Sequence, residues 1–283
     1  PGLRPLVLHA MRTVAAGRHR VFAEVIAPLR AKHGAEALRR VEKCLAIYLH
    51  ELPANFPDPK QRPKFLYFPD LPTTRYFDRE LFPWYADLEA LTATIRDEML
   101  AVLSEDSGFE PFLGHFDTPD ELEGHLSGTR GKPAWNAFFF YRHGTAYDQN
   151  RARCPRTAAA LDEIVPLCRV HEHAPEVCYS VLTPGSHILP HHGVTNTRAV
   201  THLPLVVPED CALSVSGEAR SWEEGRCFTF DDTFEHEAWN RSARTRVVML
   251  MDVWNPYLTP VERDAISELT VRIGEFNLAA GID

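Results

Sequence analysis

The feature that most constrains the fold of this chain is a series of short strand-like segments in its second half. The segments are rich in aromatic and β-branched residues and are broken by Pro, Gly or Asn, a pattern that predicts hydrophobic strands joined by turns. They span residues 135–144, 177–193, 201–208, 211–217, 225–232 and 246–254. Because few helical patterns separate them, their order favours a mainly β protein with flanking helices. Its core is expected to be a double-stranded β-helix of the jelly-roll or cupin kind.

Helical patterns dominate the start of the chain. Apolar residues recur at helical spacing over residues 6–16, 21–32 and 35–50. Gly17 and Gly34 stand between these stretches and are the expected breaks. The pattern predicts three short amphipathic helices that form an N-terminal helical segment.

A proline-rich stretch separates this segment from the rest of the chain. Prolines crowd residues 52–83, and each one removes a backbone donor and restricts the residue before it. The helical period returns over residues 84–103, where one long packing helix is expected. We therefore predict an N-terminal helical segment at 1–55 and a jelly-roll domain at 56–283.

Composition limits the partners and the compartment. Of the 283 residues, 45% are apolar, which is enough for a large single core. Asp and Glu outnumber Lys and Arg by 39 to 30, and this excess argues against nucleic acid or an anionic membrane as the main partner. The six cysteines contain no C-x-x-C pair, and no stretch has the pattern of a membrane span or a signal peptide. These features predict a cytoplasmic protein with reduced thiols.

Two histidines of the strand-rich half stand in unusual contexts. His191 ends a predicted strand in the run LPHHG, and His236 follows 45 residues later in FDDTFEH. Strands far apart in sequence face each other in a jelly roll, so the two imidazoles can converge on one metal ion. Arg246 begins another predicted strand ten residues on, which we expect to be adjacent and antiparallel to the strand of His236. Its guanidinium could hold a carboxylate with two hydrogen bonds.

This layout is that of an iron(II) and 2-oxoglutarate-dependent oxygenase, with one difference. The usual ligand set is H-x-D/E followed by a distant histidine, but the carboxylate position here is Gly193. Either the metal hypothesis is wrong, or the protein works with two histidines.

The sequence resembles the aspartyl/asparaginyl β-hydroxylase family over several runs that occur in order. These runs are SVLTPGSHILPHHGVTN, HLPLVVP, WEEG, FDDTFEHEAWN and RVVMLMDVWNPYLTPVER. The similarity is strongest over residues 179–263. It implies Fe(II), 2-oxoglutarate and O2 as cofactors.

The resemblance also implies a role for each residue of the metal site. His191 and His236 would be the two iron ligands, with water in place of the missing carboxylate. Asp232 would accept a hydrogen bond from an iron-bound water. Asp231 and Glu235 are expected to face solvent or to hydrogen-bond turns.

A second group of residues is implied to bind the cosubstrate. Ser180 and Arg246 would hold the distal carboxylate of 2-oxoglutarate, and His202 would help to hold the end that chelates iron. The family member compared has an arginine two positions before this histidine, where the present chain has Val200. The lost cation weakens the expected grip on that carboxylate unless Arg198 replaces it.

Other candidates are weaker. His192 is expected on the strand face opposite to that of its neighbour, as a substrate-side or surface residue. The run HEH at 171–173 is expected in a loop. Trp222, Trp239 and Trp254 are expected to be core aromatics without a functional role.

The implied reaction is hydroxylation of an unactivated C–H bond, most directly the β-carbon of an Asp or Asn residue. The substrate would be a peptide or an amino-acid-like molecule, free or attached to a carrier or protein. One alternative is a metal- or ligand-binding jelly roll without turnover, which would have no need for a carboxylate clamp formed by Ser180 and Arg246. Another is a halogenating or other oxidative variant, because an empty ligand position at Gly193 can take chloride.

Overall fold

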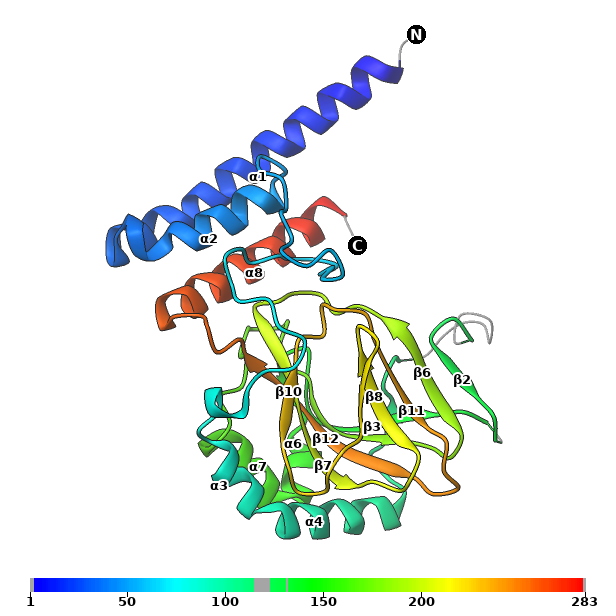
Figure 1. Ribbon diagram of the computed structural model, residues 1–283. Helices are drawn as coiled ribbons and strands as arrows, with labels where there is room; N and C mark the ends of the chain where they lie inside the picture. Colours follow the sequence, from blue (N-terminus) through cyan, green and yellow to red (C-terminus); the bar gives the residue numbers. More distant parts are fainter. Residues whose placement is uncertain (1–2, 115–122, 131, 282–283) are drawn as a thin grey trace. The chain divides into compact units, whose positions relative to one another are not determined.

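The computed structural model describes residues 3–114, 123–130 and 132–281, and the chain divides into two compact units (Figure 1). Unit 1 comprises Pro1–Asn55, Leu66–Leu71 and Tyr257–Asp283. Unit 2 comprises Phe56–Phe65 and Pro72–Pro256. No helix in the described part of the chain is long and apolar enough to cross a membrane.

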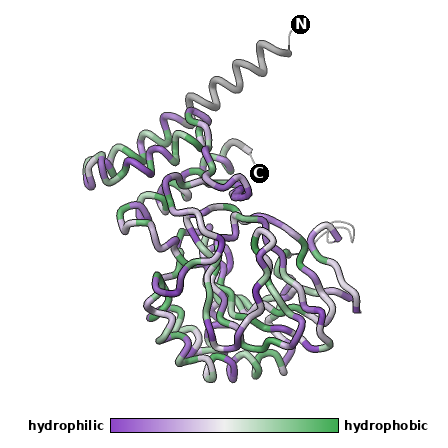
Figure 2. The backbone as a smooth tube through the Cα atoms, in the orientation of Figure 1, coloured by the Kyte–Doolittle hydropathy of each residue, from purple (hydrophilic) through white to green (hydrophobic). Residues whose placement is uncertain are grey.

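Unit 1 consists of helices α1 (Leu3–His33), α2 (Ala35–Tyr48) and α8 (Pro260–Ala280), each packed against the other two. Hydrophobic and hydrophilic residues alternate along α2 (Figure 2), and Leu38, Val41, Cys44 and Leu45 form its buried face. Phe22 lies with its ring centroid 6.1 Å from that of Tyr48 and 6.2 Å from that of Phe276. The first turn of α8 is closed by a capping box in which Thr259 and Glu262 bond each other's backbone amides.

Two helix predictions were wrong. The break expected at Gly17 is absent, because α1 is continuous from Leu3 to His33, whereas the chain does turn at Gly34, where φ is 83°. One interior glycine costs a helix about 1 kcal/mol, which a long helix with packing partners tolerates. The single helix expected over 84–103 is instead α3 (Tyr85–Ala90) followed by α4 (Thr92–Glu105).

Unit 2 contains two antiparallel sheets. The larger one has the strand order β1-β3-β5-β12-β7-β10, with β4 paired to β3, and the smaller one has the order β2-β6-β11-β8-β9. The larger sheet is formed by β1 (Glu110–Pro111), β3 (Trp135–Arg142), β4 (Thr145–Ala146), β5 (Val177–Leu182), β7 (Arg198–Val206), β10 (Phe228–Phe230) and β12 (Arg246–Trp254). The smaller sheet is formed by β2 (Leu126–Gly128), β6 (Ser186–His191), β8 (Cys211–Val215), β9 (Glu218–Arg220) and β11 (His236–Asn240). Besides α3 and α4, unit 2 contains the short helices η1 (Arg79–Leu81), α6 (Asp148–Arg153) and α7 (Pro155–Glu163).

The chain alternates between the two sheets from β5 to β12, with β8 and β9 together in the smaller one. This alternation defines a jelly roll, so the predicted fold class is confirmed. Side chains between the sheets form an apolar core that includes Leu182, Val215, Phe230 and Val248. One open end of this core is a cavity lined by residues of both sheets.

One expected neighbour relation was wrong. Arg246 begins β12, which lies between β5 and β7 in the larger sheet, whereas His236 begins β11 in the smaller sheet. The two strands are consecutive in sequence but belong to opposite walls of the jelly roll. Arg246 nevertheless lines the same cavity as His236, so the expected convergence is kept.

Candidate active site

Two imidazoles form a cross-strand pair at the cavity. His191 of β6 and His236 of β11 are register partners in the smaller sheet, and their ring centroids are 4.0 Å apart. The register shifts next to this pair, so that Ala238 lies opposite Ile188 and β6 contains one extra residue. Such a bulge re-aims the side chains on either side of it, and Ile188 and His191 both line the cavity.

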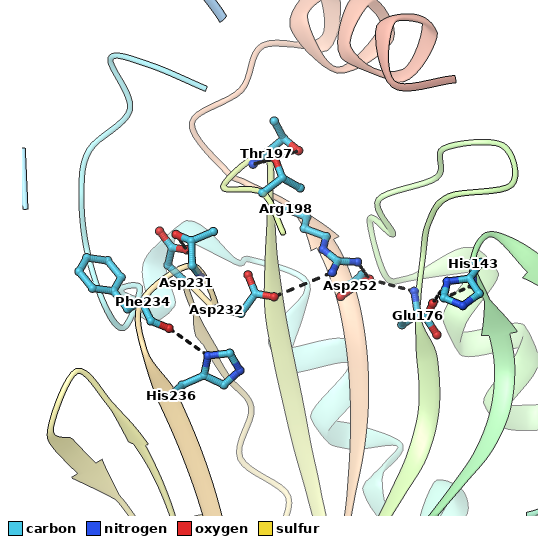
Figure 3. Close-up of polar contacts among 11 residues, drawn as sticks. His143, Glu176, Thr197, Arg198, Asp231, Asp232, Phe234, His236 and Asp252 are labelled. Carbon is cyan, nitrogen blue, oxygen red and sulfur yellow. Dashed lines mark hydrogen bonds and ion pairs between the residues drawn. The ribbon is translucent and has the colours of Figure 1, made fainter. Parts of the chain in front are cut away.

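Backbone hydrogen bonds fix which nitrogen of each imidazole carries its proton. His191 Nδ1 lies 2.8 Å from the carbonyl oxygen of Leu189, and His236 Nδ1 lies 3.0 Å from that of Phe234. A carbonyl oxygen only accepts, so both Nδ1 atoms donate and both Nε2 atoms keep a lone pair. Figure 3 shows the bond of His236. This arrangement, with a backbone partner for the second nitrogen, is typical of metal-binding histidines.

Burial keeps the two imidazoles neutral. It lowers the pKa of His236 to about 4. Burial, together with the neighbouring His236, also lowers the pKa of His191 to about 4. Neutral imidazoles at physiological pH are ready to bind a metal ion without first losing a proton.

The carboxylate of Asp232 fills the space beside Gly193. A Cβ atom on Gly193 would lie 2.1 Å from Asp232 Oδ2, so a side chain at 193 and the present position of Asp232 exclude each other. The backbone amide of Gly193 also donates to the carbonyl oxygen of Asp232, at 2.6 Å. The carboxylate of Asp232 therefore occupies the space that a side chain at position 193 would fill.

Asp232 is incompletely bonded within the protein. Its Oδ1 is buried and has no hydrogen-bond partner among the described residues. Burial raises the pKa of this carboxyl, and the nearby Arg198 and His191 oppose the rise. No group of three or more His, Cys, Asp or Glu side chains in the described part of the chain is arranged to hold a metal ion. The donor set fits a metal ion that is bound by two histidines and water, with Asp232 accepting a hydrogen bond.

Arg198 of β7 lies between two carboxylates (Figure 3). Its Nη1 bonds Oδ2 of Asp252, and its Nη2 lies 3.9 Å from Oδ2 of Asp232. Burial disfavours the charge of Arg198, but the two carboxylates raise its pKa above the usual range. Burial raises the pKa of Asp252 to about 7, against the effect of Arg198. The positive charge of Arg198 is thus balanced by carboxylates of the protein itself. That Arg198 also binds the carboxylate of a cosubstrate stays a prediction.

Arg246 and Ser180 meet deep in the cavity. Arg246 is 1% exposed, and its Nη1 donates to the carbonyl oxygen and to Oγ of Ser180, at 3.1 and 3.3 Å. Trp135 Nε1 donates to the same Oγ at 2.9 Å. Burial lowers the pKa of Arg246 to about 10, so the guanidinium stays charged at neutral pH. It has no carboxylate partner among the described residues, and its Nε is buried without any hydrogen bond.

The face of β7 that lines the cavity carries Arg198, Val200 and His202 at alternate positions. Val200 is buried and pairs in register with Asp252 of β12. His202 Nδ1 accepts a hydrogen bond from Trp222 Nε1, at 3.1 Å. Burial, with a smaller effect of Arg246, lowers the pKa of His202, so this imidazole is neutral too.

The outer part of the cavity is apolar with paired charges. Phe112, Leu113 and Val194 contribute apolar surface there. Arg142 Nη1 bonds Glu110 at 2.9 Å, and His143 Nδ1 lies 2.8 Å from Glu176. Figure 3 shows the pair of His143 and Glu176 beside Asp252.

Asp231 and Glu235 each follow one of the two alternatives expected from the sequence, solvent or a turn. Asp231 is buried and hydrogen-bonds the turn that follows it, accepting from the backbone and hydroxyl of Thr233 and also from Gln61 Nε2. Glu235 is exposed, as expected. The run 171–173 is a turn, as expected, yet His173 also lines the cavity.

The sequence did not predict the site contacts of Asp252, Trp135 and Trp222. Asp252 lies in a hydrophobic strand pattern whose alternate positions face the cavity, and that period was the available signal. Trp135 and Trp222 are core aromatics, but their indole N–H groups bond Ser180 and His202. Nothing in the sequence marks those contacts.

Fold and site together define a jelly-roll protein with a candidate two-histidine metal centre. The family model described as Aspartyl/Asparaginyl beta-hydroxylase matches residues 89–256, and the chain belongs to this family, which confirms the predicted resemblance. Aspartate beta-hydroxylase domain-containing protein 2 of Mus musculus is 35% identical over 209 residues, which are 73% of this chain and 58% of the relative.

Two further relatives differ in what they are named for. Aspartyl/asparaginyl beta-hydroxylase of Mus musculus is 35% identical over 182 residues, 63% of this chain and 22% of the relative. Ornithine lipid ester-linked acyl 2-hydroxylase of Rhizobium tropici is 34% identical over 187 residues, 65% of this chain and 62% of the relative. This chain therefore spans less than two thirds of the length of each of these three relatives.

Proposed function

We propose that the protein is an Fe(II)- and 2-oxoglutarate-dependent oxygenase that hydroxylates an unactivated C–H bond. The observation that carries the proposal is the pair His191 and His236, which present two Nε2 lone pairs at one cavity with Asp232 beside them. Membership of a family named for β-hydroxylases supports the same reaction.

The proposed roles of the chain's residues follow from their hydrogen bonds. When bound, iron with 2-oxoglutarate and O2 supplies the oxidation of the C–H bond. His191 and His236 would bind the metal through Nε2. The unpartnered Oδ1 of Asp232 would accept a hydrogen bond from a water that completes the coordination. Both histidines stay neutral, so no proton has to leave the site when the metal binds.

The environment of Arg246 favours the oxygenase over a metal-binding module without turnover. A guanidinium that is 1% exposed and has no carboxylate partner among the described residues is costly to bury. An anionic ligand in the cavity would remove that cost by pairing with it. The distal carboxylate of 2-oxoglutarate, held by Arg246 and Ser180, is the proposed ligand.

The substrate proposed from the family is the β-carbon of an Asp or Asn residue, because one relative is named as an aspartyl/asparaginyl β-hydroxylase. The outer cavity supports a second candidate. Its basic side chains Arg142 and His143 both contact protein carboxylates, and Phe112, Leu113 and Val194 present apolar surface. Such a lining suits an apolar chain better than a carboxylate, and another relative is named for an acyl chain.

Cofactor use is tested without knowledge of the substrate. Fe(II) and then 2-oxoglutarate are added to the protein without oxygen, and the weak visible charge-transfer band of the chelate is measured. The wild type should give the band, His236→Ala should abolish it, and Arg246→Ala should need much more 2-oxoglutarate. A wild type that binds iron but gives no band at any 2-oxoglutarate concentration would contradict the proposal.

The substrate class is tested by measuring turnover of each candidate. Peptides with Asp or Asn and lipids with a free acyl chain are offered to the loaded enzyme, and succinate and hydroxylated product are measured for each. A product mass 16 Da higher identifies hydroxylation, since one oxygen atom is added, and separates it from halogenation. Turnover of peptides alone would refute the acyl-chain candidate.

A further inference from the structure

We propose that Trp222 is a positioning residue that holds His202 as a hydrogen-bond donor toward an anionic cosubstrate. The inference rests on the proposed function, because His202 is the residue expected at the chelating end of 2-oxoglutarate. Trp222 lies outside the strands, and the sequence predicted it only as a core aromatic. Trp222 lies in the loop after β9.

Three of the histidines that line the cavity, His191, His202 and His236, fall into two tautomers. His191 and His236 donate from Nδ1 to backbone carbonyls, so their Nε2 atoms are acceptors. His202 is the reverse, because an indole N–H can only donate and Trp222 Nε1 points at His202 Nδ1 from 3.1 Å. A neutral imidazole whose Nδ1 accepts must carry its proton on Nε2. His202 therefore offers an N–H where the other two offer a lone pair.

An N–H group and a lone pair serve different ligands. A metal ion needs the lone pair, whereas a carboxylate needs the donor. The partner of Nδ1 thus decides which of the two ligands each histidine suits. For His202 that partner is Trp222, and without the indole N–H the imidazole could move its proton to Nδ1 and lose the donor.

Trp222 also contacts the residue proposed for the other end of the cosubstrate. The guanidinium carbon of Arg246 lies 4.9 Å from the centroid of the Trp222 ring, a cation–π distance. The indole therefore touches both proposed anion-binding residues, His202 through its N–H and Arg246 through its ring.

Packing holds this arrangement in place. Trp222 is 6% exposed and His202 is 5% exposed, and the His202 ring makes T-shaped contacts with Phe228 and Phe230 at centroid distances of 5.6 and 5.3 Å. A buried imidazole enclosed in this way has little freedom to exchange its hydrogen-bond partners, so the tautomer is set by the indole.

The matched test variant is Trp222→Phe, which removes the N–H but keeps an aromatic ring under Arg246. In the metal-free protein, ¹⁵N NMR should show Nε2–H for His202 in the wild type and a loss of that preference in Trp222→Phe. With Mn²⁺ as the metal, 2-oxoglutarate should bind about tenfold more weakly, the effect of losing one buried hydrogen bond. Binding of Mn²⁺ alone should be unchanged, because the donors of His191 and His236 are untouched.

Two further variants guard against a merely structural effect. Trp239→Phe is the same substitution on β11 at a tryptophan that contacts His187 and Arg241 rather than the cavity, and it should change neither readout. Trp222→Leu also removes the ring from Arg246 and should weaken 2-oxoglutarate binding further than Trp222→Phe.

The outcomes separate the inference from the proposed function. An unchanged His202 tautomer in Trp222→Phe, or unchanged 2-oxoglutarate affinity, overturns the inference. A wild type that binds Mn²⁺ but not 2-oxoglutarate contradicts the proposed function. Separately, NMR that finds the proton of wild-type His202 on Nδ1 overturns the tautomer assignment, and the inference with it.

Discussion

Replacing Gly193 by alanine tests whether the Asp232 carboxylate occupies the place of a side chain at 193. The added Cβ would lie 2.1 Å from Oδ2, 2.2 Å from Cγ and 2.4 Å from Oδ1 of Asp232. Ordinary contact begins near 3.4 Å, so the carboxylate would have to retreat by about 1.3 Å. It is buried, so this movement disturbs close-packed surroundings.

The expected cost follows from the size of that overlap. Overpacking a buried site costs about 1–3 kcal/mol, and we expect Gly193→Ala to lower the free energy of unfolding by about 2 kcal/mol. In an Asp232→Ala background the clashing atoms are gone, so the same substitution should cost less than about 0.5 kcal/mol. The two sites should therefore show a coupling energy of about 1.5 kcal/mol or more.

Urea denaturation, monitored by tryptophan fluorescence, measures the free energy of unfolding of unit 2, which contains Gly193 and Asp232. The five tryptophans are Trp84, Trp135, Trp222, Trp239 and Trp254, and all of them belong to unit 2. The signal thus reports on the jelly roll alone. If Gly193→Ala is as stable as the wild type, or costs the same with and without the Asp232 carboxylate, the proposed exchange of side chain and carboxylate is refuted.

Three other predictions concern pH, the cavity wall and unit 1. Because the pKa values of His191 and His236 are about 4, Mn²⁺ affinity should stay nearly constant from about pH 8 to about pH 5.5 and fall below that as protons compete for the imidazoles; a fall that begins near pH 7 would contradict the lowered pKa values. Val200→Arg adds a cation on the His202 face of β7, and calorimetry should find 2-oxoglutarate bound about tenfold more tightly; equal affinity would mean that this strand does not hold the chelating end. Thr259→Ala removes the N-cap of α8 and should lower amide-exchange protection in that helix by about 1 kcal/mol, whereas unchanged protection would show that the cap is dispensable.

The sequence predicts the strands well because their pattern is local. The predicted stretches mark β3, β8 and β12 within a few residues, and the stretch at 177–193 covers both β5 and β6. The sequence also points to the two candidate metal ligands, because His191 and His236 stand in runs that resemble one family.

Long-range pairing could not be read from the sequence. The partition of β11 and β12 into opposite sheets follows from the whole strand order, so Arg246 was expected beside the wrong strand. The register that sets His191 opposite His236 depends on a bulge in β6, and the pairing of Arg198 with Asp252 depends on the neighbouring strands β7 and β12. A single glycine also predicts a helix break poorly, as Gly17 shows, because packing outweighs its propensity.

The metal is proposed to be bound by two histidines and by no protein carboxylate. The most direct test is a crystal structure of the protein with Mn²⁺ and 2-oxoglutarate, in which anomalous scattering locates the metal. We expect Mn²⁺ bound by Nε2 of His191 and His236, a water between the metal and Asp232, and the distal carboxylate of 2-oxoglutarate on Arg246. Mn²⁺ bound elsewhere, or held directly by Asp232, would contradict this proposal.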